Sequence, residues 1–396
     1  MQVSKYLVDT LYLHFYGTKK GADGGLTITG YNGKDVDVRV PEVIGKTPVT
    51  AIAAGCFSDN KDKEQQEFLR TQLRSVEIPD SVVDIGSGAF MDCEGLERVK
   101  LPKKIKIITR CLFYKCKNLS IDIPSGITEI QDSAFEGCTM KSITVPASVK
   151  AIGEAAFGER GGWWGGTQGM PNLESIEVDP ASKYFKSVDG ILFSFDGKTL
   201  VRYPQSKTLE SYEIPDGVTT ISKNAFARVD ALKFVTIPES VDAIEDDAFS
   251  KCESLKIVSM PEKVSSFGSA FDGCVSLKEI VVPKGVSELP GGCFAGCKSL
   301  TKVGLPKGLK KIGFRAFMDC ENLSEINVPA AVRGIGELAF CGCKALKNIN
   351  ISRSTTSIGW DIFRECDNLT IHTPAGSKMY TYAKTQKIRV EELIKE

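Results

Sequence analysis

The sequence is nearly free of histidine, carries no excess of either charge and has no long apolar run. His14 and His372 are the two histidines among 396 residues, which leaves almost no material for zinc sites or histidine-dependent catalysis. Basic and acidic residues both number 50, whereas a surface for nucleic acid or anionic lipid shows a basic excess. No run of 18 apolar residues is present. We therefore expect neither a nucleic-acid partner nor insertion into a membrane.

The signatures of common enzymes are missing as well. The chain contains no G-x-S-x-G, H-E-x-x-H, Walker A or dinucleotide-binding sequence. Paired carboxylates such as Asp246 and Asp247 fall in repeated turns, where they are expected to point to solvent. The sequence therefore predicts no enzyme, no cofactor, and no catalytic or metal-binding residues.

A short pattern recurs along most of the chain at intervals of 22 or 23 residues. Prolines stand at 79, 102, 124, 146, 215, 238, 261, 283, 306 and 329, and the wide interval from 146 to 215 is three times 23. Phenylalanines keep the same intervals, at Phe90, Phe113, Phe135, Phe157, Phe226, Phe249, Phe271, Phe294, Phe317, Phe340 and Phe363. A fixed period in the twenties is typical of a solenoid, whose stacked repeats supply binding surface and no closed pocket.

The repeat reads Cys-x-x-Leu-x-x-Ile-x-Val-Pro-x-x-Val-x-x-Ile-Gly-x-x-Ala-Phe. Its Leu-x-x-Ile-x-Val stretch predicts a short strand with the apolar side chains pointing inward. Proline ends that strand because it donates no hydrogen bond. One turn buries too few side chains to fold alone, so neighbouring turns must stack. We predict a repeat solenoid with one parallel β-strand per 22–23-residue turn, made mostly of strands and turns.

This pattern resembles the leucine-rich repeats of the BspA-like type, which occur in many bacterial surface proteins. The resemblance covers roughly residues 36 to 390 and rests on strings such as 78–93 and 237–252. It implies the α/β horseshoe class of fold and adhesion to host or partner macromolecules. It also implies export, whereas residues 1–10 lack a secretory signal and the many cysteines suit a reducing compartment. A cell-surface and a cytoplasmic location both stay open.

Nine of the thirteen cysteines stand three residues after a repeated phenylalanine. These are Cys93, Cys116, Cys138, Cys252, Cys274, Cys297, Cys320, Cys343 and Cys366. A disulfide framework or a metal ladder is one interpretation; a column of buried free thiols is the other. We favour buried thiols, because the repeat spacing alone explains the positions and no C-x-x-C pair is present.

The regular spacing divides the chain into a solenoid and two ends. Within residues 1–50, short stretches such as 26–29 and 36–40 alternate apolar and polar residues, which predicts a β cap at the amino-terminal end. Residues 51–373 form the expected solenoid, interrupted by an insertion at 158–212. Residues 374–396 predict a helix followed by a strand, which resembles the terminal cap of the family.

The insertion supplies the first candidate binding residues. Trp163 and Trp164 stand in the glycine-rich segment 158–170, where they could stack on a sugar or anchor a partner protein. Their rings could equally fold back onto the solenoid, because exposed paired tryptophans are unfavourable in water. Further along, Asp196-Gly197 stands between two apolar runs and predicts a β-hairpin.

The outward residues of the predicted strands supply the second candidate. Down the repeats they carry no uniform charge and no aromatic stripe, which argues against a polyanionic ligand. Phe234 and Ile257, on neighbouring turns, form a small exposed apolar pair or ordinary surface. We predict a noncatalytic, adhesin-like scaffold that binds a protein or carbohydrate partner as a monomer. The alternatives are a structural spacer or self-assembling unit without a ligand and, less favoured, an enzyme with its site in 158–212.

Overall fold

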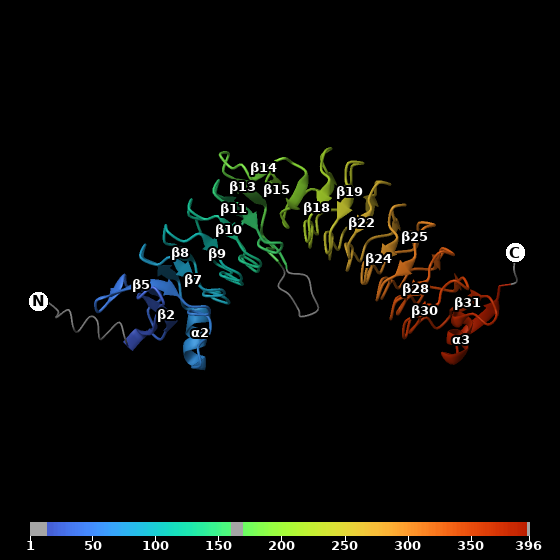
Figure 1. Ribbon diagram of the computed structural model, residues 1–396, viewed down its shortest axis with the longest axis horizontal. Helices are drawn as coiled ribbons and strands as arrows, with labels where there is room; N and C mark the ends of the chain where they lie inside the picture. Colours follow the sequence, from blue (N-terminus) through green and yellow to red (C-terminus); the bar gives the residue numbers. More distant parts are fainter. Residues whose placement is uncertain (1–13, 160–168, 394–396) are drawn as a thin grey trace, which may run out of the picture. The chain divides into compact units, whose positions relative to one another are not determined.

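Short stacked strands joined by tight turns build the computed structural model (Figure 1), which describes residues 14–159 and 169–393. The chain forms two compact units, residues 1–196 and 197–396. In both units the chain coils, and most turns pair with a neighbouring turn through parallel strands. The predicted class, a β-solenoid with little helix, is confirmed.

Within residues 16–159 and 169–196, the first unit contains one helix. Its elements are β1 (Tyr16–Lys20), β2 (Leu26–Tyr31), β3 (Asp37–Arg39), β4 (Val43–Ile44), β5 (Thr47–Ile52), α2 (Lys63–Thr71), β6 (Ser75–Glu77), β7 (Asp84–Ile85), β8 (Arg98–Lys100), β9 (Ile107–Ile108), β10 (Glu129–Ile130), β11 (Ser142–Val145), β12 (Ala151–Ile152), β13 (Ser175–Val178), β14 (Phe185–Val188) and β15 (Ile191–Ser194). The antiparallel strands β1 and β2 precede the turns, and β2 pairs in parallel with β5.

The second unit has more regular turns. Its elements are β16 (Thr199–Arg202), β17 (Ser211–Glu213), β18 (Thr220–Ile221), β19 (Phe234–Thr236), β20 (Ala243–Ile244), β21 (Ile257–Ser259), β22 (Ser266–Phe267), β23 (Glu279–Val281), β24 (Glu288–Leu289), β25 (Lys302–Gly304), β26 (Lys311–Ile312), β27 (Glu325–Ile326), β28 (Gly334–Ile335), β29 (Asn348–Asn350), β30 (Ser357–Ile358), β31 (Thr370–Thr373), α3 (Lys378–Thr385) and β32 (Arg389–Glu392). Helix α3 and strand β32 follow the last turn, and β32 pairs in parallel with β31.

Each regular turn contains two strands, so the prediction of one strand per turn was incomplete. In one turn, the three-residue strand β19 is followed after Pro238 by the two-residue strand β20. Strand β19 pairs with β17 and β21, while β20 pairs with β18 and β22. The second strand forms because the backbone on either side of the inward Ile244 must satisfy its hydrogen bonds, and neighbouring turns offer the same groups in register.

A column of phenylalanine rings runs through the core of each unit. From Phe226 to Phe363, successive rings are 4.8 to 5.9 Å apart between centroids, with 1° to 12° between ring planes. The backbone beside the rings is bonded too: the amide of Phe317 donates to the carbonyl of Ala339 one turn later, at 2.8 Å. The repeated phenylalanines therefore lie on a third line of hydrogen bonds between turns.

The nine cysteines of the repeat are buried and free, as their spacing predicted. Each thiol lies within hydrogen-bonding distance of the carbonyl oxygen of the phenylalanine one turn earlier. Cys320 Sγ, for example, is 3.1 Å from the oxygen of Phe294, and Cys343 Sγ is 3.2 Å from that of Phe317. The thiol is thus a small apolar side chain with one weak donor, which suits a crowded position between turns.

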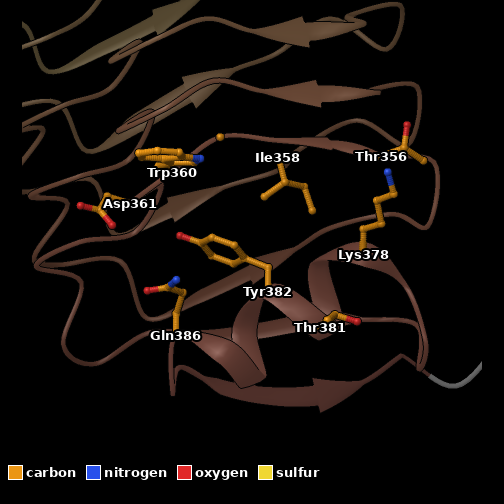
Figure 2. A pocket seen from close by; sticks show the side chains of 9 residues that line it. Thr356, Ile358, Trp360, Asp361, Lys378, Thr381, Tyr382 and Gln386 are labelled. Atoms are coloured by element: carbon orange, nitrogen blue, oxygen red, sulfur yellow. The ribbon is translucent and has the colours of Figure 1, made fainter.

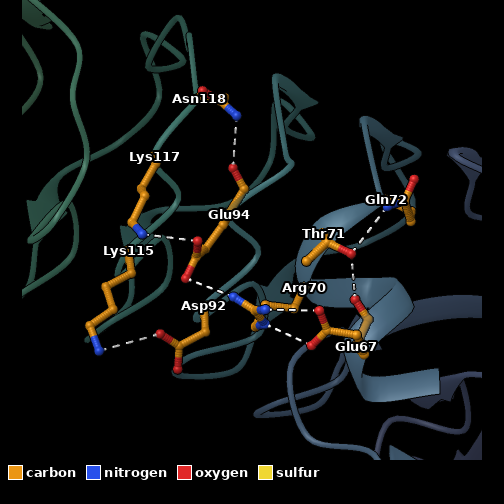
Figure 3. Close-up of polar contacts among 9 residues, drawn as sticks. All are labelled: Glu67, Arg70, Thr71, Gln72, Asp92, Glu94, Lys115, Lys117 and Asn118. Atoms are coloured by element: carbon orange, nitrogen blue, oxygen red, sulfur yellow. Dashed lines mark hydrogen bonds and ion pairs between the residues drawn. The ribbon is translucent and has the colours of Figure 1, made fainter. Parts of the chain in front are cut away.

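Ion pairs link neighbouring turns on the surface of the first unit (Figure 3). Glu94 lies 2.9 Å from Lys117 on one side and 3.0 Å from Arg70 on the other, and Arg70 also contacts Glu67 at 2.8 Å. These side chains are largely in solvent, where such pairs contribute little to stability. Their opposite signs leave no concentrated charge on this surface.

The insertion contains a hairpin that the sequence analysis did not assign. Strands β14 and β15 pair antiparallel around Asp189-Gly190, and both turn residues have positive φ, 51° and 75°. Two left-handed residues in a two-residue loop form the turn type that suits the twist of a hairpin. The predicted turn at Asp196-Gly197 lies between β15 and β16, and its Gly197 has φ 75°.

Candidate recognition surfaces

Strands β19, β21, β23 and β25 follow one another along the second unit, and each exposes outward side chains. In each strand the middle residue is buried and its neighbours face solvent. The parallel register sets Phe234 beside Ile257, and their exposed fractions are 44% and 45%. The structure therefore brings together the two apolar residues that the sequence singled out.

Val281 is a further exposed apolar residue, on the next strand along the chain. It is the last residue of β23, as Ser259 is of β21, so it stands two positions further along its strand than Ile257 does. It is 69% exposed, more than either Phe234 or Ile257. Its register partner on β25 is Gly304, where a Cβ atom would lie 3.4 Å from both methyl groups of Val281. The glycine thus leaves the valine side chain uncovered. We call Phe234, Ile257 and Val281 the strand-face patch; the sequence analysis gave Val281 no role.

Charges around the strand-face patch are balanced. On the strand of Val281 itself, Glu279 stands beside Lys302, and Lys302 stands beside Glu325, in the parallel register. Lys233, just before Phe234, pairs with Glu210. A neutral apolar centre with alternating charges at its margin is the composition of a protein-binding surface. It does not match the uniform charge that a polyanion requires.

A second candidate surface, which the sequence analysis missed, lies beside helix α3 (Figure 2). It is a hollow of about 670 Å³, with Ile358, Trp360, Asp361, Lys378, Tyr382 and Gln386 among its lining residues. We call it the terminal hollow. Trp360 is 80% exposed, which is exceptional for an indole side chain. The sequence does contain a sign of this surface, because Trp360 occupies the outward repeat position held by Glu337 one turn earlier and by Phe314 two turns earlier.

Tyr382 forms the opposite wall of the terminal hollow and is held firmly. Its hydroxyl oxygen accepts a hydrogen bond from the amide of Ile362, at 3.0 Å. Its ring meets Phe363, the last phenylalanine of the column, edge to face with 6.4 Å between centroids. Burial raises the pKa of Tyr382 above its usual value, so the hydroxyl stays protonated at neutral pH.

Trp163 and Trp164 lie outside the described residues, so their predicted role stays a hypothesis. Nor does the described part of the chain contain a group of three or more histidine, cysteine, aspartate or glutamate side chains placed to hold a metal ion. In the same part of the chain, no helix has the length and apolar character needed to cross a membrane.

The two-strand turns, the phenylalanine column and the 22–23-residue period define a leucine-rich repeat β-solenoid. The family model described as BspA type leucine rich repeat region matches residues 47–161, 203–288 and 268–385, in six copies. These matches cover most of the chain, which therefore belongs to the BspA-type leucine-rich repeat family. No curated protein matches the chain.

Solved structures of bacterial leucine-rich repeat proteins are similar over most of the chain. A leucine rich cell surface protein from Faecalibacterium prausnitzii is 26% identical, with a TM-score of 0.56, and the match covers 85% of this chain and 93% of that one. A leucine-rich repeat protein from Eubacterium ventriosum is 25% identical, with a TM-score of 0.62 and coverage of 83% and 92%. One from Bacteroides ovatus is also 25% identical, with a TM-score of 0.54 and coverage of 96% and 98%. The family suggests a repeat scaffold without enzymatic activity.

Proposed function

We propose that this protein is a noncatalytic recognition scaffold that binds a protein partner through the strand-face patch. The observation that carries this proposal is the exposure of three large apolar side chains on three successive strands: Phe234 and Ile257, which stand side by side in the register, and Val281 on β23. Scattered apolar residues are ordinary on a protein surface, whereas a contiguous group is typical of an interaction site.

The shape of the patch favours a protein over a small ligand. Outward residues of a parallel sheet form a broad face. Gly304 has no side chain beside Val281, so the surface there is open to a partner. Such a face can bury area against another folded surface, which is how protein interfaces gain affinity. Trp163 and Trp164 belong to this proposal as additional anchors for the partner, because two tryptophans can carry much of an interface's energy.

An adhesin-like role at the cell surface is part of the same proposal. Its support is the similarity to the Faecalibacterium prausnitzii cell surface protein, at 26% identity over 85% of this chain. A spacer or self-assembling unit is the alternative. A spacer requires no particular side chains on the exposed strand face. The apolar patch favours recognition, because a spacer gains nothing from exposing Phe234 and Val281.

The test is a binding screen followed by charge substitution. The purified chain is screened on an array of extracellular matrix and cell-surface proteins, and hits are measured by surface plasmon resonance. Phe234→Asp with Val281→Asp should weaken binding by about tenfold or more, because it places charge in the interface core. Asn350→Asp, at an exposed position of β29, is the matched control and should bind normally.

Two results would overturn the proposal. Normal binding by the double variant would show that the strand-face patch is not the interface. A screen without hits, together with concentration-dependent assembly in sedimentation experiments, would favour the self-assembling alternative.

A further inference from the structure

We propose that the terminal hollow is a binding site for a neutral oligosaccharide, separate from the strand-face patch. A pyranose ring has one apolar face of C–H groups and a rim of hydroxyls. Its binding site needs a flat aromatic surface with polar groups around the edge. The terminal hollow has both, on elements that the fold holds in place.

The aromatic surface is the indole of Trp360. At the same repeat position, the ring of Phe314 is covered by the guanidinium of Arg315, whose Cζ lies 4.6 Å from the ring centroid. Among the described residues, no ring or cation contact covers Trp360, and 80% of its surface is exposed. Exposing an indole face costs free energy that a ligand recovers on binding, because the ring leaves water.

The floor and the opposite wall are rigid. Figure 2 shows Trp360 and Tyr382 on either side of the space, with Ile358 beside them, toward Lys378. The hydrogen bond from the Ile362 amide and the edge contact with Phe363 fix the ring of Tyr382. Gly359 has no room for a side chain, since a Cβ atom there would lie 2.2 Å from the amide nitrogen of Glu337. A site fixed in this way loses little entropy when it binds.

Hydrogen-bond donors and acceptors surround the aromatic walls. Asp361 and Gln386 lie at one end of the terminal hollow and Lys378 at the other (Figure 2). The carboxylate accepts, the ammonium donates and the amide does both, which matches the donor and acceptor character of sugar hydroxyls. Asp361 Oδ2 is 3.7 Å from Arg364 Nη1, which restrains the carboxylate.

A second hollow of about 610 Å³ shares Asp361, Tyr382 and Gln386 with the first. Polar side chains such as Arg364 and Asn368 line it. Two adjoining spaces, each within the usual size of ligand pockets, suit a chain of sugars better than a single one. The first space would hold the unit that stacks on Trp360, and the second would hold its more polar neighbour.

The charges point to a neutral sugar. The terminal hollow has one acidic residue, Asp361, and one basic residue, Lys378. The second hollow is lined by equal numbers of each: Asp361, Glu365 and Asp367 against Arg364, Lys387 and Arg389. A site for sulfated, phosphorylated or other acidic glycans would show a basic excess. An apolar peptide would leave these polar groups without hydrogen bonds.

The test uses calorimetry with the full chain and defined probes. Cellohexaose, maltohexaose, xylohexaose, mannohexaose and triacetylchitotriose are titrated separately, with a heparin hexasaccharide as the acidic probe. At least one neutral probe should bind. Trp360→Ala should weaken that binding by about tenfold or more, and Trp360→Phe should retain part of it, because a smaller ring still stacks. Phe314→Ala, at the same repeat position outside both hollows, should bind as the wild type does.

Three results would overturn the proposal. They are an absence of binding to every neutral probe, normal sugar binding by Trp360→Ala, and tighter binding of the heparin fragment than of any neutral probe. If Trp360→Ala instead weakens a protein partner and no sugar binds, the hollow is part of a protein interface and the sugar proposal fails. Phe234→Asp with Val281→Asp should leave sugar binding unchanged, so the two proposed surfaces can fail independently.

Discussion

The rings of Phe249 and Phe271 lie one turn apart and almost perfectly parallel, with 5.1 Å between centroids and 1° between planes. Both side chains are completely buried. Their separation is close to the spacing of paired strands, so the rings stack with the same repeat as the backbone. The phenylalanine column is therefore the core that joins one turn to the next within the second unit.

Truncating one ring of this column should open the solenoid locally. Phe271→Ala should lower the free energy of unfolding by about 3–5 kcal/mol, because it removes buried apolar surface and leaves a cavity. Hydrogen exchange should accelerate most in the turns that contain Phe249 and Phe294, since repeats couple mainly to their neighbours. Val281→Ala, at an exposed position, is the control. Equal acceleration in every turn would contradict this view of the core.

The buried thiols should make the protein sensitive to alkaline pH. Burial raises the pKa of Cys252 and of Cys366 to about 12, against about 8.5 in an unfolded chain. Above the lower value the unfolded state releases a proton that the folded state keeps. Stability is therefore fully present below about pH 8.5 and should fall by about 1.4 kcal/mol per pH unit for each such thiol.

Urea unfolding at pH 8 and pH 10.5 measures this effect. Replacing Cys252 and Cys366 by alanine should make the loss of stability with pH less steep, whatever the substitutions cost at pH 8. An unchanged slope in that double variant would mean that the two thiols do not titrate on unfolding.

Alkylation should distinguish one reactive cysteine from the nine unreactive cysteines of the repeat. Cys111 is only partly buried, whereas the nine repeat cysteines are buried beside backbone carbonyls. Iodoacetamide should therefore label Cys111 in the native protein, and the nine others only in urea, because the thiolate reacts and burial suppresses it. Mass spectrometry of proteolytic peptides shows the order in which the cysteines are labelled. Native labelling of Cys297 or Cys320 at the rate of Cys111 would contradict the buried column.

Replacing Trp163 and Trp164 together tests the hypothesis drawn from the sequence. The double alanine variant should weaken partner binding by about tenfold or more and leave the melting temperature nearly unchanged. Normal binding combined with a melting temperature several degrees lower would identify the two rings as packing residues.

The sequence predicted those parts of the fold that depend on a repeated side chain. The phenylalanine and cysteine columns were predictable because one buried position recurs in every turn. The second strand was not, because two residues such as Ala243 and Ile244 carry too little pattern. Left-handed residues such as Asp247 and Asp319 were also hidden, since their φ values of 56° and 58° are imposed by neighbouring turns and not by glycine.

The candidate surfaces were predictable only in part. Phe234 and Ile257 could be paired from the repeat spacing, because parallel register follows from a constant turn length. Val281 drew no attention because its exposure depends on Gly304 in the next turn. Trp360 was missed because the hollow beside it is built by helix α3, and the repeat pattern does not say where that helix packs.

Hydroxyl-radical footprinting of the partner complex tests the central claim most directly. Solvent-exposed side chains are oxidised by the radical, and an interface shields them. Binding should strongly reduce oxidation of Phe234, Ile257 and Val281, while Phe314, exposed at another repeat position, keeps its rate. If a partner binds and the strand-face patch is oxidised as in the free protein, recognition takes place elsewhere and the proposed function of this surface is wrong.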